Sequence, residues 1–386
     1  MDKRVANELI RGLTDLFGNA SSVHVYGQKA RAAVDRARRE VGQLIGARQN
    51  EIVFVSGGTE ANNLAIRGVC EASIPHGRHI VTSAIEHPSV AGVCDSLEKR
   101  GWEVSRVPVS EKGIVRIADV REAIRPDTVL ITVMLANNEI GTIQPISEIS
   151  KLVRKRREAG HQNLRLHTDA VQAAGRIDLN VDQLGCDLLS ISGHKIYAPK
   201  GVGALYVRRG VRLAPQNIGG HQERERRGGT ENVPAIMAFG EAAKISREEL
   251  VVRTEHVRRL RDQFESEVQK RIEDVVLNGD RDARLPHLTN FSFRYIEGEG
   301  LLINLDLQGV AVSTGSACSS GTLEPSPVIR ALGRDDELAR GSIRFSFGKD
   351  NTDDDVDYVV EILADAVARL RELSPLNKQF VTSQTP

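Results

Sequence analysis

The sequence predicts an α/β protein with a mainly parallel seven-stranded sheet, helices on both faces of the sheet, and a smaller α+β domain. Short apolar runs alternate with segments of helical period over the first two-thirds of the chain, which is the pattern of βαβ units. From about residue 288 onward, shorter strand-like and helical segments follow one another. The 386 residues, 40% hydrophobic and 27% charged, have the composition of a globular protein with room for more than one domain.

The expected elements follow in order along the chain. Seven short runs have the composition of strands: 52–56, 79–83, 103–107, 129–135, 164–168, 188–192 and 204–207. Helical patterns lie between them, for example at 59–71, 89–99 and 146–159. A long charged helical segment, 233–271, leads to strands at 290–293 and 342–347 and a last helix at 353–372. We therefore place the large domain at 18–245, the small domain at 1–17 and 246–373, and a tail at 374–386.

The charges and cysteines limit the classes of partner. The 52 basic and 52 acidic side chains cancel, so no overall field favours nucleic acid or an anionic membrane. The apolar runs are too short to cross a bilayer, and residues 1–7 lack an apolar signal region. The four cysteines, at positions 70, 94, 186 and 318, show neither close pairing nor zinc-site spacing. We expect a cytoplasmic protein with reduced thiols and no direct nucleic-acid or membrane partner.

Lys195 is the strongest single candidate for a catalytic residue. It follows the apolar run at 188–192 in Ser192-Gly193-His194-Lys195. Burial of a lysine favours the neutral, nucleophilic amine, which is the form that makes a Schiff base with a carbonyl cofactor. The alternative is a solvated turn lysine, which is commoner for a lysine considered alone.

An anion site is predicted where the first strand meets its helix. Ser56-Gly57-Gly58-Thr59 follows a strand and opens a helix, so backbone N–H groups and the Thr59 hydroxyl could meet a phosphate. The alternative is a plain glycine turn with a threonine cap. The stretch lacks the GxxxxGK[ST] pattern, which disfavours ATP as the ligand.

Three further strands end in polar residues. His87 could stack on a flat cofactor or face water, and Asp169 could pair with a pyridine nitrogen or cap a helix. Asn137 and Asn138 supply amides after another strand. Because the carboxyl ends of parallel strands meet at one edge of a sheet, we expect these residues and Lys195 to share one crevice.

Motifs along nearly the whole chain carry a family resemblance. The matching stretches are Phe17-Gly-Asn19-Ala-Ser-Ser22-Val-His24, Ser56-Gly-Gly-Thr59-Glu60-Ala-Asn62, Glu86-His87, Asn137-Asn138-Glu139-Ile-Gly-Thr142, His167-Thr-Asp169-Ala-Val-Gln172, Ser192-Gly-His194-Lys195, Gly219-Gly-His-Gln222-Glu223-Arg224, Gly229-Thr230-Glu231-Asn232, Ser313-Thr-Gly315-Ser-Ala-Cys318-Ser and Ser342-Ile-Arg344-Phe. With them the chain resembles the cysteine desulfurases of the class-V aminotransferase family, which are fold-type I enzymes that use pyridoxal 5'-phosphate.

The resemblance implies a role for each matching residue. Lys195 would bond the cofactor covalently, His87 would stack on its ring, Asp169 would pair with the pyridinium nitrogen and Gln172 with the ring hydroxyl. The residues implied for phosphate binding and its surroundings are Gly58, Thr59, Ser192, Gly193, His194 and, from the other subunit of a homodimer, Thr230. Asn138, also in the cofactor set, and Arg344 would bind the α-carboxylate of L-cysteine, for which the guanidinium fork is suited.

Cys318 is the candidate sulfur acceptor. It lies among small residues in a loop that we expect to be mobile, whereas the other three cysteines suit buried apolar positions. By the resemblance, the thiolate of Cys318 attacks the substrate sulfur, giving alanine and a persulfide, and His87 shuttles protons. The stretch Thr322-Leu-Glu-Pro-Ser-Pro327 resembles the long-loop branch that feeds iron–sulfur scaffold proteins. Cys318 could then transiently ligate a cluster shared with such a scaffold; another sulfur acceptor, such as a tRNA-modifying enzyme, is the alternative.

Two alternatives to desulfuration remain at this stage. Another pyridoxal-phosphate enzyme, a selenocysteine lyase or an aminotransferase, would share every motif except the one around Cys318. The second alternative is a catalytically impaired, partner-binding protein. Family members carry an Asp-x-x-Ala-Thr-Thr segment ahead of the point where Met1 stands, and Ala20 replaces a common proline.

Overall fold

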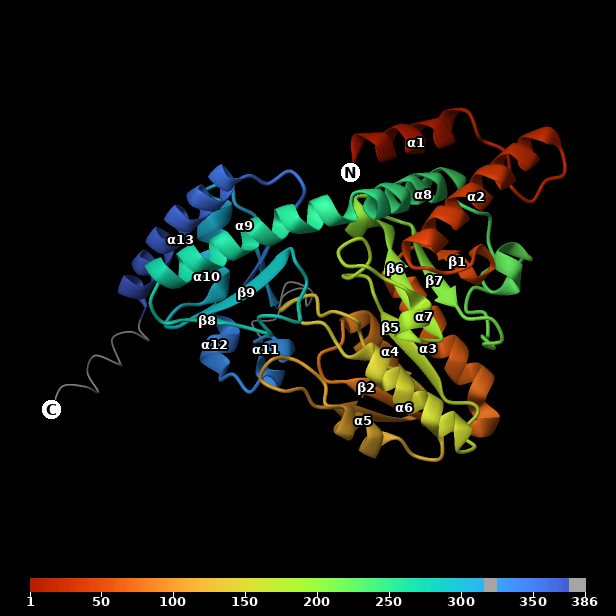
Figure 1. Cartoon of the computed structure of the whole chain (residues 1–386), viewed down its shortest axis with the longest axis horizontal. Coiled ribbons are helices and arrows are strands. Elements are labelled where there is room, and N and C mark those ends of the chain that lie inside the picture. The colour runs from red at the N-terminus through yellow and green to blue at the C-terminus, as the bar shows by residue number, and fades with distance from the viewer. Residues whose placement is uncertain (316–324, 375–386) are drawn as a thin grey trace. The chain divides into compact units, whose positions relative to one another are not determined.

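A computed structural model describes residues 1–315 and 325–374, which form two compact units (Figure 1). Unit 1 comprises residues 1–107, 115–136 and 144–250. Unit 2 comprises residues 108–114 and 137–143 and the described residues from Val251 onward.

Unit 1 is built on a seven-stranded sheet in the order β1-β7-β6-β5-β4-β2-β3. Its strands are β1 (Ile52–Val55), β2 (His79–Ser83), β3 (Glu103–Val107), β4 (Thr128–Thr132), β5 (Arg165–Asp169), β6 (Leu188–Ser192) and β7 (Gly203–Val207). Only β7 runs against its neighbours, β1 and β6. Every residue of β1, β2, β4, β6 and β7 is buried, as expected for strands covered on both faces. The predicted mainly parallel α/β fold is confirmed.

Helices follow the strands of unit 1 and cover its sheet. They are α3 (Gly58–Ser73), the 3₁₀ turn η2 (Ile74–His76), α4 (Pro88–Glu98), α5 (Ile117–Ala123), α6 (Ile146–Glu158) and α7 (Val181–Leu184). Helix α3 packs on α4 and against the sheet, while α6 neighbours α5 and α7 (Figure 1). Right-handed crossovers put these two groups on opposite faces, because the strand order reverses between β2 and β4. A core that includes Leu64, Ile66, Ile80 and Leu130 lies beneath α3 and α4.

The N-terminal helix belongs to unit 1. Helices α1 (Lys3–Thr14) and α2 (Val25–Leu44) both pack on α8 (Val233–Glu248). The sequence led us to expect residues 1–17 in the smaller domain; in the structure they group with unit 1. The reason is a close helix contact, since a Cβ on Gly12 would lie 2.6 Å from the Cα of Pro234. The other short elements of unit 1 are η1 (Gln49–Glu51), η3 (Gly193–Ile196) and η4 (Gln222–Glu225).

Unit 2 is an α+β unit with a four-stranded antiparallel sheet in the order β10-β11-β9-β8. Its strands are β8 (Val275–Leu277), β9 (Leu288–Phe293), β10 (Ser313–Thr314) and β11 (Ser342–Ser346). Its helices are α9 (Leu250–Arg271), α10 (Gly298–Asp306), α11 (Pro327–Ala331), α12 (Asp336–Arg340) and α13 (Asp353–Leu373). Side chains such as Phe264, Phe291 and Leu363 form its core. The helical segment expected at 233–271 divides at Glu249 into α8 and α9.

Candidate active site

The predicted site residues of unit 1 lie at or just after the carboxyl ends of strands that run in the same direction. Strands β1, β2, β4, β5 and β6 run the same way, because β7 is antiparallel to both β1 and β6 and the remaining pairs are parallel. Their carboxyl ends therefore meet at one edge of the sheet. Five predicted residues follow this edge: Thr59 after β1, His87 after β2, Asp169 at the end of β5, and Ser192 and Lys195 at and after the end of β6.

Asp169 is a buried carboxylate held by two donors. Its Oδ1 accepts the backbone N–H of Val171, and its Oδ2 accepts the side-chain amide of Asn62 at 2.7 Å. Burial raises the pKa of Asp169, while these two donors and the positive charges of His87 and Lys195 act in the opposite direction. A carboxylate in this setting is stabilised by a further cation beside it.

His87 caps helix α4 and is linked to Asp169. Its Nδ1 lies 2.7 Å from the hydroxyl of Ser89 and accepts the backbone N–H of that residue at 3.1 Å. The amide of Asn62 donates to the same hydroxyl at 2.8 Å. Burial lowers the pKa of His87, the nearby Lys195 lowers it further, and Asp169 raises it. A continuous set of hydrogen bonds therefore joins His87 to Asp169.

Hydroxyl and imidazole groups gather beside the first turn of α3. Thr59 is exposed in that turn. Gly57, at the N-cap position, has no side chain that could hydrogen-bond to the N–H groups of the turn. The Ser192 hydroxyl lies 2.9 Å from Nδ1 of His194, and a Cβ on Gly57 would lie 3.9 Å from that hydroxyl. Burial lowers the pKa of His194, and Lys195 lowers it further. Gly58 and Gly193 open the α3 helix and the η3 turn of this cluster.

The remaining predicted residues of unit 1 lie in turns. Lys195 is half-buried in η3, and Gln172 is half-buried in the turn directly after β5. Thr230 is exposed in the segment that precedes α8.

Two predicted substrate residues lie together within unit 2. Nη1 of Arg344, on β11, donates to the backbone carbonyl of Asn138 at 2.9 Å, and its Nη2 donates to the Ser313 hydroxyl. Asn138 is buried, in the short segment after β4 that belongs to unit 2. The structure thus places Asn138 beside the Arg344 guanidinium, a group whose nitrogens can bind a carboxylate bidentately.

Comparison with known proteins decides the family. The sequence profile of the class-V aminotransferases, described as "Aminotransferase class-V", matches residues 1–359. The chain belongs to the class-V aminotransferase family. It is 49% identical to a cysteine desulfurase IscS of Dictyoglomus turgidum, over 95% of this chain and 92% of that protein. It is 46% identical to the cysteine desulfurase IscS 1 of Archaeoglobus fulgidus, over 98% and 97% of the two chains. A solved NifS-like protein superposes with a TM-score of 0.89 at 34% identity, covering 96% of this chain and 97% of that one.

Class-V aminotransferases of this type use pyridoxal 5'-phosphate, and the side chains of unit 1 fit that cofactor. Buried Asp169, whose pKa is raised by burial, suits a protonated pyridine nitrogen as its counter-charge. The hydroxyls of Thr59 and Ser192, together with the first turn of α3, suit a phosphate. The chemistry of the donor set therefore agrees with the family.

Sequence reasoning missed three residues of this class-V site. Asn62 stood in a recognised motif and Ser89 follows His87 by two residues, but their side chains were assigned no role. Glu86 is fully buried, and burial raises its pKa to about 8 although the Ser83 hydroxyl and the Met134 N–H donate to it. Its Oε2 has no hydrogen-bond partner among the described residues. The one available signal was a charged residue directly before a functional histidine at a strand end.

Three of the four cysteines lie in the part of the chain that the structure describes. Cys318 lies in 316–324, outside the described residues. Cys70, Cys94 and Cys186 are buried and reduced, and burial raises the pKa of Cys94 and of Cys186 to about 12. These three thiols are poor nucleophiles at neutral pH.

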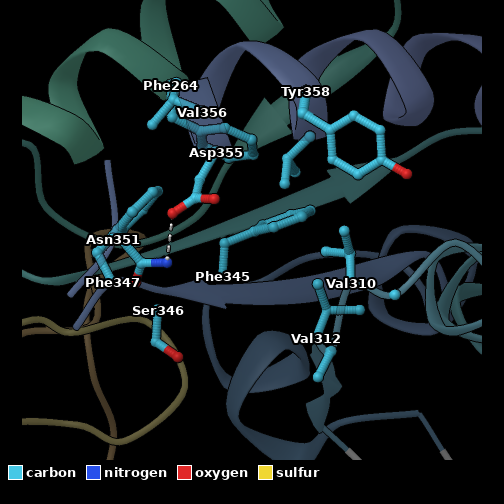
Figure 2. Close-up of a pocket in the computed structure, with 13 residues that line it drawn as sticks. Phe264, Val310, Val312, Phe345, Ser346, Phe347, Asn351, Asp355, Val356 and Tyr358 are labelled. Atoms are coloured by element: carbon cyan, nitrogen blue, oxygen red, sulfur yellow. Dashed lines mark hydrogen bonds between the residues drawn. The ribbon is translucent and has the colours of Figure 1, made fainter. Parts of the chain in front are cut away.

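Across residues 1–315 and 325–374, no group of three His, Cys, Asp or Glu side chains is arranged to hold a metal ion. No helix in the same part of the chain combines the length and apolar character needed to cross a membrane. A cavity of ≈ 300 Å³ in unit 2 has a mixed lining, with apolar side chains such as Phe345 and Val312 and polar ones such as Asn351 and Asp355 (Figure 2). Its lining contains none of the residues predicted for cofactor or substrate.

Proposed function

We propose that this protein is a cysteine desulfurase that converts L-cysteine to L-alanine and passes the sulfur to Cys318. The observation that carries the proposal is the convergence of Lys195, His87 and Asp169 on one edge of the unit 1 sheet. The relatives named cysteine desulfurase IscS, similar over nearly the full chain, support the same reaction.

Each residue of the cofactor set has a distinct task. Lys195 would bond the cofactor, His87 would stack on its ring, Asp169 would hold the ring nitrogen in its protonated form, and Gln172 would contact the ring hydroxyl. The groups that bind and surround the phosphate are Gly58, Thr59, Ser192, Gly193, His194 and, from a second subunit, Thr230. Bound pyridoxal phosphate supplies an electron-withdrawing ring that acidifies the α-hydrogen of an attached amino acid.

The substrate is oriented by its carboxylate. The Arg344 guanidinium and the Asn138 amide bind the α-carboxylate of L-cysteine, in keeping with their contact in unit 2. Asn138 also borders the cofactor. Once the substrate amine has taken its place, the freed Lys195 amine would accept the proton of the substrate α-carbon, and His87 would move protons between the substrate and solvent.

The sulfur transfer is balanced without an external oxidant. The Cys318 thiolate attacks the substrate sulfur, so that an S–S bond forms as the substrate Cβ–S bond breaks. The electron pair of the Cβ–S bond stays on carbon, which is protonated to the methyl group of alanine. The sulfur is oxidised to the sulfane level while the carbon is reduced, and Cys318 is left as a persulfide.

A sulfur acceptor must then take the sulfane sulfur from Cys318. An iron–sulfur scaffold protein is the acceptor that we propose, with Cys318 able to ligate the nascent cluster briefly as cargo. Housing this reaction in the reducing cytoplasm keeps the Cys318 thiol available between turnovers.

A homodimer completes the proposed site, because Thr230 acts on the cofactor of the other subunit. An apolar face of unit 1 supports a second copy as partner. Its side chains, on α1, on the start of α2 and between them, are all more than half exposed: Ile10, Leu13, Phe17, Val23, Val25 and Tyr26. Two of them, Phe17 and Tyr26, are in ring contact, and exposed apolar side chains that gather in this way are typical of an interface.

Product analysis tests the activity. The purified protein is loaded with pyridoxal phosphate and given L-cysteine and a thiol reductant, and alanine and sulfide are measured together. We expect equal release of both, loss of both in Lys195→Ala and Cys318→Ala, and retention in the thiol control Cys186→Ala. Release of alanine by Cys318→Ala at the wild-type rate would instead favour a lyase that needs no enzyme thiol. A protein that binds cofactor and acceptor but forms no product would be a partner-binding protein.

Mixed dimers test the role of Thr230. Lys195→Ala and Thr230→Ala protomers are unfolded together and refolded as hybrids. If Thr230 acts across the interface, one site of each hybrid contains both wild-type residues, and activity returns. If Thr230 acts within its own subunit, both sites of the hybrid remain damaged, and mixing restores nothing.

A further inference from the structure

Asn62 and Ser89 link two residues of the cofactor site. Nδ2 of Asn62, on α3, lies 2.7 Å from Oδ2 of Asp169 and 2.8 Å from Oγ of Ser89. Oγ of Ser89, on α4, lies 2.7 Å from Nδ1 of His87. Asn62 is fully buried and Ser89 nearly so, which means that water does not compete for these bonds.

The chemistry of Asp169 fixes the direction of every bond in this set. A carboxylate only accepts hydrogen bonds, so Asn62 must present its NH₂ group to Asp169. The opposite amide orientation would set a carbonyl oxygen against the carboxylate. The observed orientation leaves Oδ1 of Asn62 without a hydrogen-bond partner among the described residues. The Asn62 amide thus donates to both Asp169 and Ser89, while its own oxygen is left unpaired within the described part of the chain.

The direction continues from Ser89 to His87. The Ser89 hydroxyl accepts from Asn62, and its own proton is then directed to Nδ1 of His87. The backbone N–H of Ser89 donates to the same nitrogen at 3.1 Å. Nδ1 thus faces two donors and acts as the acceptor of the ring. A neutral histidine with an accepting Nδ1 carries its proton on Nε2.

We propose that Asn62 and Ser89 are positioning residues that hold His87 in the Nε2–H tautomer, so that its proton exchange with the substrate runs through Nε2 alone. The tautomer is a property of this chain without any ligand, whereas its use in catalysis rests on the proposed desulfurase function. The charged groups that face His87 are Asp169 and Lys195, and burial of the ring lowers its pKa. Burial and Lys195 favour the neutral ring, whereas Asp169 opposes them. A neutral ring can carry its proton on either nitrogen, and the two donors of Ser89 select Nε2.

Nitrogen NMR of the histidine rings tests this directly. The protein is labelled with ¹⁵N-histidine, and two-bond ¹H–¹⁵N spectra are recorded with and without cofactor, with His87 assigned from its loss in His87→Asn. We expect an unprotonated Nδ1 and a protonated Nε2 in the wild type at neutral pH. In Asn62→Asp, the new carboxyl lies against Asp169 and must share one proton with it, because two carboxylates at that distance do not both ionise. Its other oxygen accepts the Ser89 proton, so Nδ1 of His87 should become protonated.

Two further comparisons keep the test decisive. Asn63→Asp adds the same charge one residue away, where the side chain donates to the Thr59 carbonyl instead, and should leave the His87 tautomer unchanged. Ser89→Ala, which needs no buried charge, should shift the ring towards a mixture of tautomers, and Ser89→Thr should restore the wild-type spectrum. Circular dichroism confirms that each variant is folded.

The outcomes separate this inference from the function. A wild-type Nδ1 that carries the proton, or spectra of Asn62→Asp and Ser89→Ala that match the wild type, would overturn the inference even if the enzyme is active. The expected spectra in a protein that releases no alanine would uphold the tautomer and contradict the desulfurase function. If both hold, Ser89→Ala should lower kcat, within the roughly 10²–10⁴-fold that a general acid–base group contributes, and leave KM unchanged.

Discussion

Two loops that carry proposed site residues are held in different ways. In unit 1, the segment from Asn217 to Thr230 is fixed to the sheet by a buried ion pair. In unit 2, Gly315 and Ser326 lie before and after residues 316–324, which include Cys318. Both contact one carboxyl group, that of Glu139. The two ties differ in kind: the segment of unit 1 is held by a buried charge pair, and the described flanks in unit 2 by a hydrogen bond.

The tie in unit 1 is bidentate and nearly inaccessible to water. Both terminal nitrogens of Arg38 donate to the carboxylate of Glu223, at 2.5 and 2.7 Å, and the Phe54 N–H of β1 donates to it as well. Three consecutive non-glycine residues, Glu223, Arg224 and Glu225, have φ of 46°, 57° and 65°. Such left-handed backbone is strained and persists only where surrounding contacts enforce it. The ion pair supplies that enforcement.

The tie in unit 2 is a hydrogen bond from one hydroxyl. Oγ of Ser326 donates to Oε2 of Glu139 at 2.6 Å and caps α11 by accepting the N–H of Ile329. Gly315 lies against the same two groups, because a Cβ there would lie 2.4 Å from Oε2 of Glu139 and 2.5 Å from Cβ of Ser326. Glu139 therefore lies beside both Gly315 and Ser326, which flank residues 316–324.

Breaking the ion pair should have the largest effect. Arg38→Met leaves the Glu223 carboxylate buried without its counter-charge, and we expect the free energy of unfolding to fall by about 3–5 kcal/mol. Urea unfolding of the cofactor-loaded protein measures this. The matched control is Arg116→Met, which removes the exposed pair with Asp119 and should cost about 1 kcal/mol or less. Equal losses in the two variants would mean that the pair does not fix the segment.

Removing the Ser326 hydroxyl should have a moderate, local effect. Ser326→Ala leaves the buried Glu139 oxygen without its donor and Ile329 without its cap, at a cost of about 1–3 kcal/mol. Hydrogen exchange at the Ile329 amide reports the loss, because this N–H is bonded to the missing oxygen. Ser326→Thr keeps a hydroxyl and should exchange at the wild-type rate. Unchanged exchange in the alanine variant would show that the loop end is held by other contacts.

Features that depend on neighbouring residues could be predicted from the sequence, whereas contacts between distant residues could not. Strands β2, β3 and β6 match the predicted ranges, and the strand-end rule located His87, Asp169 and Lys195, because local periodicity and turn position encode both. Pairings between distant positions are not encoded locally. The Arg38–Glu223 pair joins residues 185 positions apart, and Asn62 meets Asp169 only because α3 folds back over β5. Those contacts depend on packing, which no single stretch of sequence displays.

A further expected effect is a pH dependence that arises in unit 2. Burial raises the pKa of Glu139 from 4.5 to about 7, although the Ser326 hydroxyl and Arg344 oppose the shift. Between these two values the folded protein binds a proton that the unfolded chain does not, so stability is full below pH 4.5 and falls as the pH rises towards 7. The slope contributed by this group is at most about 1.4 kcal/mol per pH unit.

Glu139→Gln isolates this contribution, because an amide cannot titrate. The difference in unfolding free energy between the wild type and the variant should decline from pH 4.5 to pH 7 and stay level above it. Glu86→Gln in unit 1 provides the comparison, since the pKa of Glu86 is about 8 and its window should extend one unit further. A difference curve for Glu139 that is flat throughout would mean that the pKa of this carboxyl is the same in the folded protein as in the unfolded chain. The ends of the Cys318 loop would then be held by a charge, and the contrast with the ion pair of unit 1 would be one of degree only.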